Sequence, residues 1–142
     1  MEEQTFQIGV KALIANNRGE ILLVKATPDR VDGKWPVHWD IPGGRIKNET
    51  PTETLRREVE EEIGVTDIDV VALFDAFASN IKIKDLHTLF LVVYVCKMDE
   101  NAKITLSEEH SEYRWFKPRD AIDPLSYKYP SEFLAKLSAY KP

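Results

Sequence analysis

The most constraining feature of the sequence is a 23-residue stretch, GGRIKNETPTETLRREVEEEIGV, which occupies residues 43–65. It joins a Gly-Gly pair to a segment with helical periodicity. Pro51 suits the first turn of a helix, Thr50 and Glu53 form a capping-box pattern, and Gly64 suits the position just after the last turn. The stretch therefore predicts a short loop followed by a helix whose two ends are fixed by local residues.

The same helix is expected to carry three carboxylates on one face. Successive positions advance by about 100° around a helix axis, so residues three and four apart lie together. Glu58, Glu61 and Glu62 have these spacings. The neighbouring apolar stripe consists of Leu55, Val59 and Ile63. Like charges this close repel unless a cation intervenes, and hard oxygen ligands suit Mg²⁺ or Mn²⁺.

This pattern resembles the Nudix box, G-x5-E-x7-R-E-U-x-E-E-x-G-U, in which U is a bulky aliphatic residue. The specified positions are filled by Gly43, Glu49, Arg57, Glu58, Val59, Glu61, Glu62, Gly64 and Val65. A solvated acidic helix face is the simpler interpretation, but a chance match of seven residue types is on the order of one in ten million. The match begins at the first glycine of Pro42-Gly43-Gly44, so it leaves open whether the Gly43 or the Gly44 carbonyl contacts a metal.

The resemblance implies a fold, an activity and roles for residues. The implied fold is the Nudix-type α/β/α sandwich with a mixed β-sheet between helices, formed by residues 1–142 as a single domain. The implied activity is hydrolysis of a diphosphate linkage with help from Mg²⁺. Glu58, Glu61 and Glu62 would bind metal or activate water, with Glu58 as the preferred base. Glu49 and Arg57 would support these carboxylates.

Further site residues are expected outside the box. Lys25 and Arg45 can contact phosphates, although exposed charges at strand ends explain them equally well. Glu109 is a further candidate metal ligand in a late loop, and the neighbouring His110 is expected only as a hydrogen-bonding loop residue. Trp35 lies in a loop bounded by Gly33 and Pro36, and it is the best candidate for a ring that faces the base.

Alternating and continuous apolar segments predict the remaining elements. The segments 6–14 and 20–25 are separated by turn residues and are expected to form a hairpin. Further strands are expected over 39–41, 68–77, 86–98 and 113–116, with a turn of helix over 118–122 and a terminal helix over 130–140.

Composition excludes several classes of protein. The formal net charge of −5 argues against a DNA-binding protein, and the longest apolar run is too short to cross a membrane. The acidic N-terminus does not resemble a signal peptide, and the single cysteine, Cys96, permits no internal disulfide. We therefore expect a cytoplasmic protein that acts on a small nucleotide, as a monomer or homodimer.

Several functions remain compatible with this pattern. An ordinary or oxidised nucleoside triphosphate is the preferred substrate. A nucleotide sugar or ADP-ribose and a dinucleoside polyphosphate are the alternatives, and RNA 5′ ends stay possible. A nucleotide sensor without catalysis ranks lower, because such domains usually lose box glutamates and all of them are present here.

Overall fold

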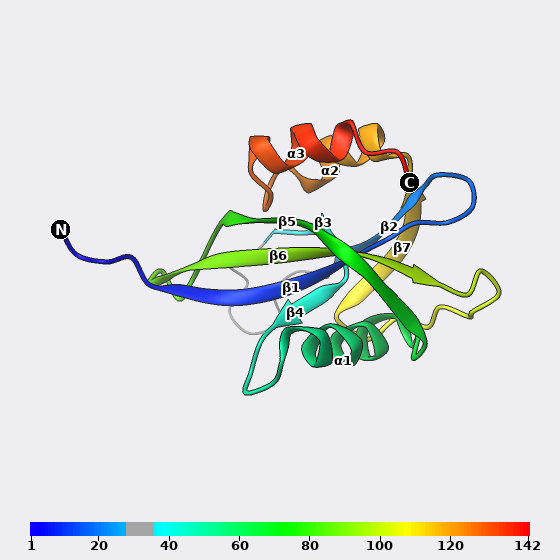
Figure 1. Ribbon diagram of the computed structural model, residues 1–142, viewed down its shortest axis with the longest axis horizontal. Coiled ribbons are helices and arrows are strands. Elements are labelled where there is room, and N and C mark those ends of the chain that lie inside the picture. The colour runs from blue at the N-terminus through cyan, green and yellow to red at the C-terminus, as the bar shows by residue number, and fades with distance from the viewer. Residues whose placement is uncertain (28–35) are drawn as a thin grey trace.

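The structure, a computed structural model, describes residues 1–27 and 36–142 and consists of two β-sheets with helices on both sides (Figure 1). In chain order the elements are β1 (Phe6–Ile14), β2 (Ile21–Ala26), β3 (His38–Asp40), β4 (Gly43–Arg45), α1 (Pro51–Ile63), β5 (Ile68–Ile83), β6 (His87–Met98), β7 (His110–Phe116), the 3₁₀ helix η1 (Pro118–Ala121), α2 (Ile122–Leu125) and α3 (Ser131–Ser138).

The larger sheet is mixed and has the strand order β4-β1-β6-β5. Strand β1 runs parallel to β6 along its whole length, whereas β4 and β5 run antiparallel to their neighbours. The smaller sheet has the order β3-β2-β7 and is antiparallel throughout. Strand β4 contains Gly43 and Gly44, so the Gly-Gly pair is held beside β1 at the edge of the mixed sheet.

The expected hairpin between the first two strands is wrong. The turn itself forms, since the Asn16 N–H donates to the Glu20 carbonyl at 2.9 Å, but only the bridge between Ala15 and Ile21 continues it. Beyond that bridge β1 and β2 enter different sheets. Both strands are buried at consecutive rather than alternate positions, because each has packed layers on both of its faces.

Two hydrophobic cores fill the space between the layers. One is built around α1 and includes Leu55, Val59 and Ile63, the apolar stripe expected from the sequence. The other lies under α2 and α3 and includes Phe133 and Leu137. Figure 1 shows α1 on one side of the sheets and α2 with α3 on the other. The expected α/β/α sandwich is therefore confirmed.

Helix α1 has the ends that its sequence predicts. The Glu53 N–H donates to Thr50 Oγ1 at 3.2 Å, and Pro51 occupies the first turn. Gly64 ends the helix with φ 71°, a left-handed conformation that favours glycine. These contacts fix the two ends of the helix that carries the carboxylates.

Other elements are longer or shorter than expected from the sequence. Strand β5 extends to Ile83 instead of ending near Phe77, and β7 begins at His110 instead of Tyr113. The terminal helix α3 is shorter than expected, and the 118–122 turn is a 3₁₀ helix that leads into α2. Among the described residues no helix is long and apolar enough to cross a membrane.

Candidate active site

An arginine on α1 connects three of the box carboxylates. Arg57 Nε and Nη2 donate to the two carboxylate oxygens of Glu49 at 2.8 and 2.7 Å, a bidentate arrangement. Arg57 Nη1 lies 3.0 Å from Glu58 Oε1 and 3.3 Å from Glu61 Oε1. Thr54 Oγ1 also donates to Glu49 at 3.2 Å. The hydrogen bonds from Arg57 lower the pKa of Glu49, so Glu49 is a fixed anion that holds the guanidinium in place.

Glu58 packs directly against the Gly-Gly strand. A Cβ atom on Gly44 would lie 2.3 Å from the Glu58 carboxyl carbon, so only glycine leaves room for this carboxylate. Burial raises the pKa of Glu58, although Arg57 opposes that shift. The Glu58 carboxylate therefore binds a proton more readily than an exposed glutamate does.

Gly43 occupies a position that other residues cannot adopt without strain. Its φ is 154°, and a Cβ atom there would lie 1.9 Å from the Val10 carbonyl oxygen. This close approach lets the Gly43 N–H donate to Glu62 Oε1 at 3.2 Å. The loop and the last carboxylate of the box are thus joined directly.

Glu62 is the most buried of the four box carboxylates. It is 7% exposed, and burial raises its pKa to about 8, with nearby Asp40 and Glu58 adding to the effect and Lys11 opposing it. His110 Nε2 lies 3.5 Å from Glu62 Oε2, and burial lowers the pKa of this histidine. His110, expected only as a loop residue, therefore contacts the box. The raised pKa means that the Glu62 carboxyl binds a proton more readily than an exposed glutamate does.

A buried ionic cluster lies beneath Glu62, and the sequence analysis missed it. Lys11 Nζ and Lys128 Nζ lie 3.1 and 2.7 Å from Asp40 Oδ2. The Tyr129 hydroxyl donates to Asp40 Oδ1. Burial alone would raise the pKa of Asp40, but the two ammonium groups hold it well below its usual range. Asp40 is therefore ionised at neutral pH.

The signal for this cluster was present but weak. Lys11 is the charged residue within an otherwise apolar run of β1, and Asp40 directly precedes the Ile41-Pro42 link to the Gly-Gly pair. A charged residue in a buried strand needs a partner of opposite charge. That argument points to a buried ion pair, but it does not identify Lys128, which lies 88 residues from Asp40 along the chain.

The box carboxylates offer the type of ligand that Mg²⁺ prefers. Their oxygens are hard donors, and the guanidinium of Arg57 already lies between Glu58 and Glu61 as a cation would. As placed, no three His, Cys, Asp or Glu side chains of the described residues converge on one point. The residues therefore fit Mg²⁺ by chemistry, and binding it requires the exposed Glu61 and the half-buried Glu58 to turn toward it.

The remaining candidate residues are less closely connected. Lys25 Nζ lies 3.9 Å from Glu112, and Arg45 is exposed at the end of β4. Glu109 is also exposed, and its carbonyl accepts hydrogen bonds from the N–H and hydroxyl of Thr27 at 3.0 and 3.1 Å. Trp35 lies outside the described residues, so its predicted contact with a base stays a prediction.

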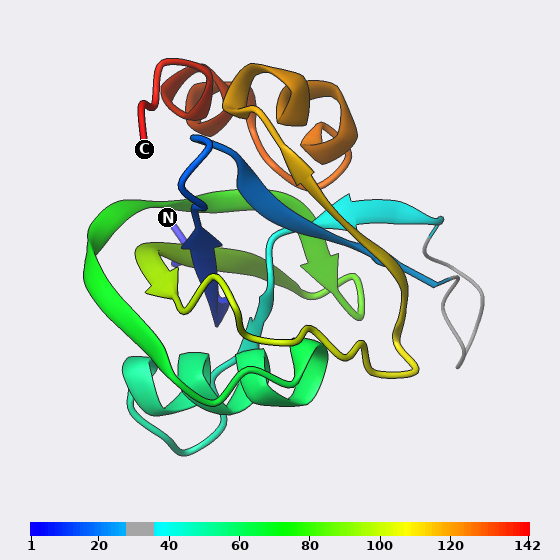
Figure 2. The same ribbon diagram turned by 90° about the vertical axis from the view of Figure 1, so that its right-hand side faces the viewer.

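The segment between β6 and β7 links this site to the end of α1 (Figure 2). The Thr105 N–H donates to the Ile63 carbonyl at 2.8 Å, and the Ser107 N–H donates to the Glu62 carbonyl at 3.0 Å. These bonds satisfy carbonyl groups at the end of the helix, which no residue of α1 can reach. They also hold the segment that leads to Glu109 and His110 beside Glu62.

Comparison with known proteins agrees with this geometry. The NUDIX domain model matches residues 5–137. The chain is 30% identical over 118 residues to the nucleoside triphosphatase NudI of Escherichia coli K12, covering 77% of this chain and 81% of that protein. It is 32% identical over 114 residues to NudI of Klebsiella pneumoniae, covering 75% and 79% of the two chains.

Solved structures share the fold along nearly the whole chain. The MutT protein from Methanosarcina mazei Go1 superposes with a TM-score of 0.73 and 27% identity, covering 96% of this chain and 94% of that one. A C. elegans Ap4A hydrolase gives a TM-score of 0.71 at 20% identity, covering 94% and 92%. Together with the complete set of box residues, these matches show that the chain belongs to the Nudix family, and that it is a Nudix pyrophosphohydrolase.

Proposed function

We propose that the protein hydrolyses an ordinary or oxidised nucleoside triphosphate to the nucleoside monophosphate and pyrophosphate, with Mg²⁺ as the cofactor and Mn²⁺ as an alternative. The family acts on small nucleotides, and relatives about 30% identical are named nucleoside triphosphatases. One structural observation carries the proposal. The carboxylates of Glu58 and Glu62 contact the Gly43–Gly44 strand, and the guanidinium of Arg57 lies between Glu58 and Glu61.

We assign the metal ligands to this group. Glu58, Glu61 and Glu62 would hold the cation, with the Gly43 carbonyl as a backbone ligand and Glu109 as a further ligand from the segment before β7. When bound, the cation neutralises charge on the phosphates and makes a coordinated water more acidic. The raised pKa of Glu62, about 8, supports this assignment because a nearby cation favours the ionised form of a buried carboxyl.

The chain's own residues supply the other parts of the reaction. Water attacks one phosphorus, its proton passes to Glu58, and the bond to the bridging oxygen breaks so that pyrophosphate leaves. Glu49 and Arg57 keep Glu58 and Glu61 oriented through the bonds described above. Lys25 and Arg45 would contact phosphate oxygens, and Trp35 would face the base.

The setting of the enzyme follows from the same residues. We propose that residues 1–142 act as a single domain, as a monomer or homodimer in the cytoplasm, on free nucleotides rather than DNA. Cys96 is buried, and burial raises the pKa of its thiol to about 12. A thiol that stays protonated is inert toward oxidation and metal binding.

A hydrolysis screen with Mg²⁺ and with Mn²⁺ tests the proposal. The panel holds ordinary and oxidised nucleoside triphosphates, ADP-ribose, nucleotide sugars and dinucleoside polyphosphates, and both phosphate and pyrophosphate are measured. We expect pyrophosphate and a nucleoside monophosphate from a triphosphate. Glu61→Gln should lower kcat by about 10²-fold or more, whereas Glu60→Gln, an exposed residue on the same helix, should leave it unchanged.

Other results would redirect the proposal. Turnover of ADP-ribose, a nucleotide sugar or a dinucleoside polyphosphate alone would keep the site assignment and replace the substrate. Full turnover by Glu61→Gln would refute the assignment of Glu61. Tight nucleotide binding without any turnover would identify a sensor.

A further inference from the structure

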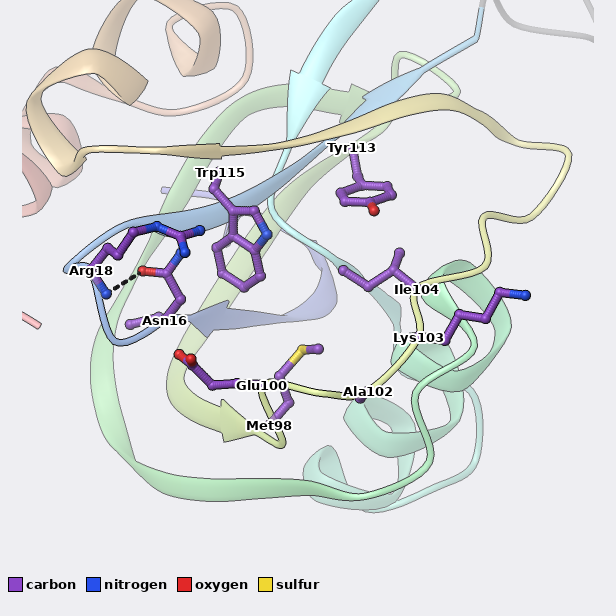
Figure 3. A pocket seen from close by; sticks show the side chains of 10 residues that line it. Asn16, Arg18, Met98, Glu100, Ala102, Lys103, Ile104, Tyr113 and Trp115 are labelled. Atoms are coloured by element: carbon purple, nitrogen blue, oxygen red, sulfur yellow. Dashed lines mark hydrogen bonds between the residues drawn. The ribbon is translucent and has the colours of Figure 1, made fainter.

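A cavity lies apart from the box carboxylates and has no role in the reaction proposed above. Its volume is about 380 Å³, within the range of small-molecule sites. It opens where the turn after β1, the end of β6, the following segment and β7 come together (Figure 3). The residues that determine its chemistry are Arg18, Met98, Glu100, Ile104, Tyr113 and Trp115.

Two aromatic rings form one wall of this cavity. Tyr113 and Trp115 are two residues apart on β7, so their side chains project from the same face of the sheet. Among the described strands, β7 is at the edge of its sheet. Tyr113 is 41% exposed, whereas Trp115 is half-buried and packs against the core around α1. Aromatic rings at a cavity wall can stack on planar ligands.

The opposite walls are apolar and leave a slot rather than an open surface. Met98 and Ile104 face the rings across the cavity (Figure 3). Ile104 precedes Thr105, whose N–H is fixed to the end of α1. On the other side, the Asn17 N–H donates to the Glu100 carboxylate, and Asn16 Oδ1 accepts from the N–H groups of Arg18 and Glu20. The slot is thus formed in advance of any ligand.

Free polar groups lie at the edges of the slot. The indole N–H of Trp115 and the hydroxyl of Tyr113 have no hydrogen-bond partner within the described part of the chain. Arg18 uses its Nε for Glu20, and among residues 1–27 and 36–142 its terminal nitrogens have no partner. Within the same residues, one Glu100 carboxylate oxygen accepts from Asn17 and the other has no partner. A planar ring with both donors and acceptors on its edge would match these groups.

We propose that this cavity binds the base of a nucleoside or nucleotide, as a second site separate from the catalytic one. The base stacks on Tyr113 and Trp115, with Met98 and Ile104 against its other face. The indole N–H donates to a ring acceptor, and Arg18 is placed to contact an anionic substituent such as a phosphate. The site is independent of the metal ligands, because none of its residues belongs to the box.

The indole signal of Trp115 provides a direct test by two-dimensional ¹H–¹⁵N NMR. The chain has three tryptophans, and Trp115→Phe identifies the signal. Adenosine and AMP are titrated into the complete protein in EDTA, so that hydrolysis does not interfere. We expect a saturable shift of the Trp115 signal, retained in Glu58→Gln. Tyr113→Ala should weaken binding about tenfold, because base stacking on one ring contributes an effect of that size.

A cavity-filling variant and two control ligands complete the test. Ile104→Trp should abolish the titration while its melting temperature shows that the protein is folded. Two results would overturn the proposal: no saturable shift with either nucleotide, or a shift that both Tyr113→Ala and Ile104→Trp leave unchanged. Binding of indole without adenosine would also overturn it, since the site would then select apolar rings. Binding of inorganic phosphate alone would assign the effect to Arg18 and exclude a base site.

Discussion

Two charged clusters meet at Glu62, and they differ in burial and in charge balance. On the open face of α1, Arg57 is the cation for Glu49, Glu58 and Glu61. In the buried cluster, Lys11 and Lys128 both contact Asp40. Water stabilises the excess negative charge of the open cluster, whereas a buried charge must be paired inside the protein.

This difference separates two tasks within one site. The open cluster keeps negative charge available for a cation, and its side chains can turn. The buried cluster is rigid and places positive charge beneath Glu62, where Lys11 opposes the rise in the pKa of that carboxyl. Burial of Lys11 itself is offset by Asp40, which raises the pKa of Lys11 so that it stays protonated. The comparison predicts large stability effects in the buried cluster and mainly catalytic effects in the open one.

Removing the buried carboxylate should have the largest effect on stability. Asp40→Ala leaves two ammonium groups without their anion, so we expect a loss of about 3–5 kcal/mol in the free energy of unfolding. Urea denaturation measures this change. Asp69→Ala is the matched control, because Asp69 is exposed and should change stability by less than about 0.5 kcal/mol. Equal effects of the two variants would show that Asp40 is not a buried anion.

Acid should weaken the buried cluster without a mutation. The pKa of Asp40 is lower in the folded protein than in the unfolded chain, so the unfolded chain takes up a proton first. The stabilisation from Asp40 is therefore complete above the usual aspartate pKa near 4 and is lost as pH falls further. Urea denaturation from pH 6 down to pH 3 should show this loss. The fall should be shallower in Asp40→Asn, and identical slopes would contradict the assignment.

Changing the open cluster should affect catalysis more than stability. Arg57→Lys removes the bidentate contact with Glu49, because an ammonium group lacks the planar pair of donors. We expect kcat to fall about tenfold or more and the melting temperature to change little. Arg56→Lys is the control, since Arg56 donates to the Ile68 carbonyl instead of a box residue. A large loss of stability in Arg57→Lys would show that the open cluster, like the buried one, mainly stabilises the fold.

The smallest expected effect lies at the start of α1. Thr50→Ala removes the acceptor for the Glu53 N–H and should cost about 1 kcal/mol of stability. Thermal denaturation measures the change, with Thr52→Ala, an exposed threonine in the first turn, as its control. Because Thr50 adjoins Glu49, the same variants in the hydrolysis assay show whether the helix start also positions the open cluster. Equal stability of both variants would exclude a capping role for Thr50.

Local patterns predicted the parts of the structure that depend on neighbours in the chain. The caps of α1, its apolar stripe and its carboxylate face all follow from residues within one short segment, and the structure has them. The contacts of Arg57 with Glu49 and Glu61 are also short in sequence, eight and four residues apart. The contact with Glu61 follows from helix geometry, and the contact with Glu49 depends on the short loop that leads into the helix.

Long-range pairing was not predictable in the same way. The turn at Asn16 suggested a hairpin, but β1 pairs with β6, which lies far away in the sequence. Nothing local distinguishes a strand that pairs with its neighbour from one that leaves it, because both have the same apolar composition. The cavity beside Trp115 likewise depends on four segments that only the fold brings together.

The sequence by itself determined the Nudix box, the helix that carries it and the class of chemistry, because these depend on spacing within one turn-helix unit. Only the tertiary structure decided which charges are buried. Lys11, Asp40 and Lys128 come from β1, β3 and the segment after α2, and they meet because the two sheets pack together around shared cores. A charged residue in the sequence has no fixed energy: its solvation and its partners depend on the packing around it.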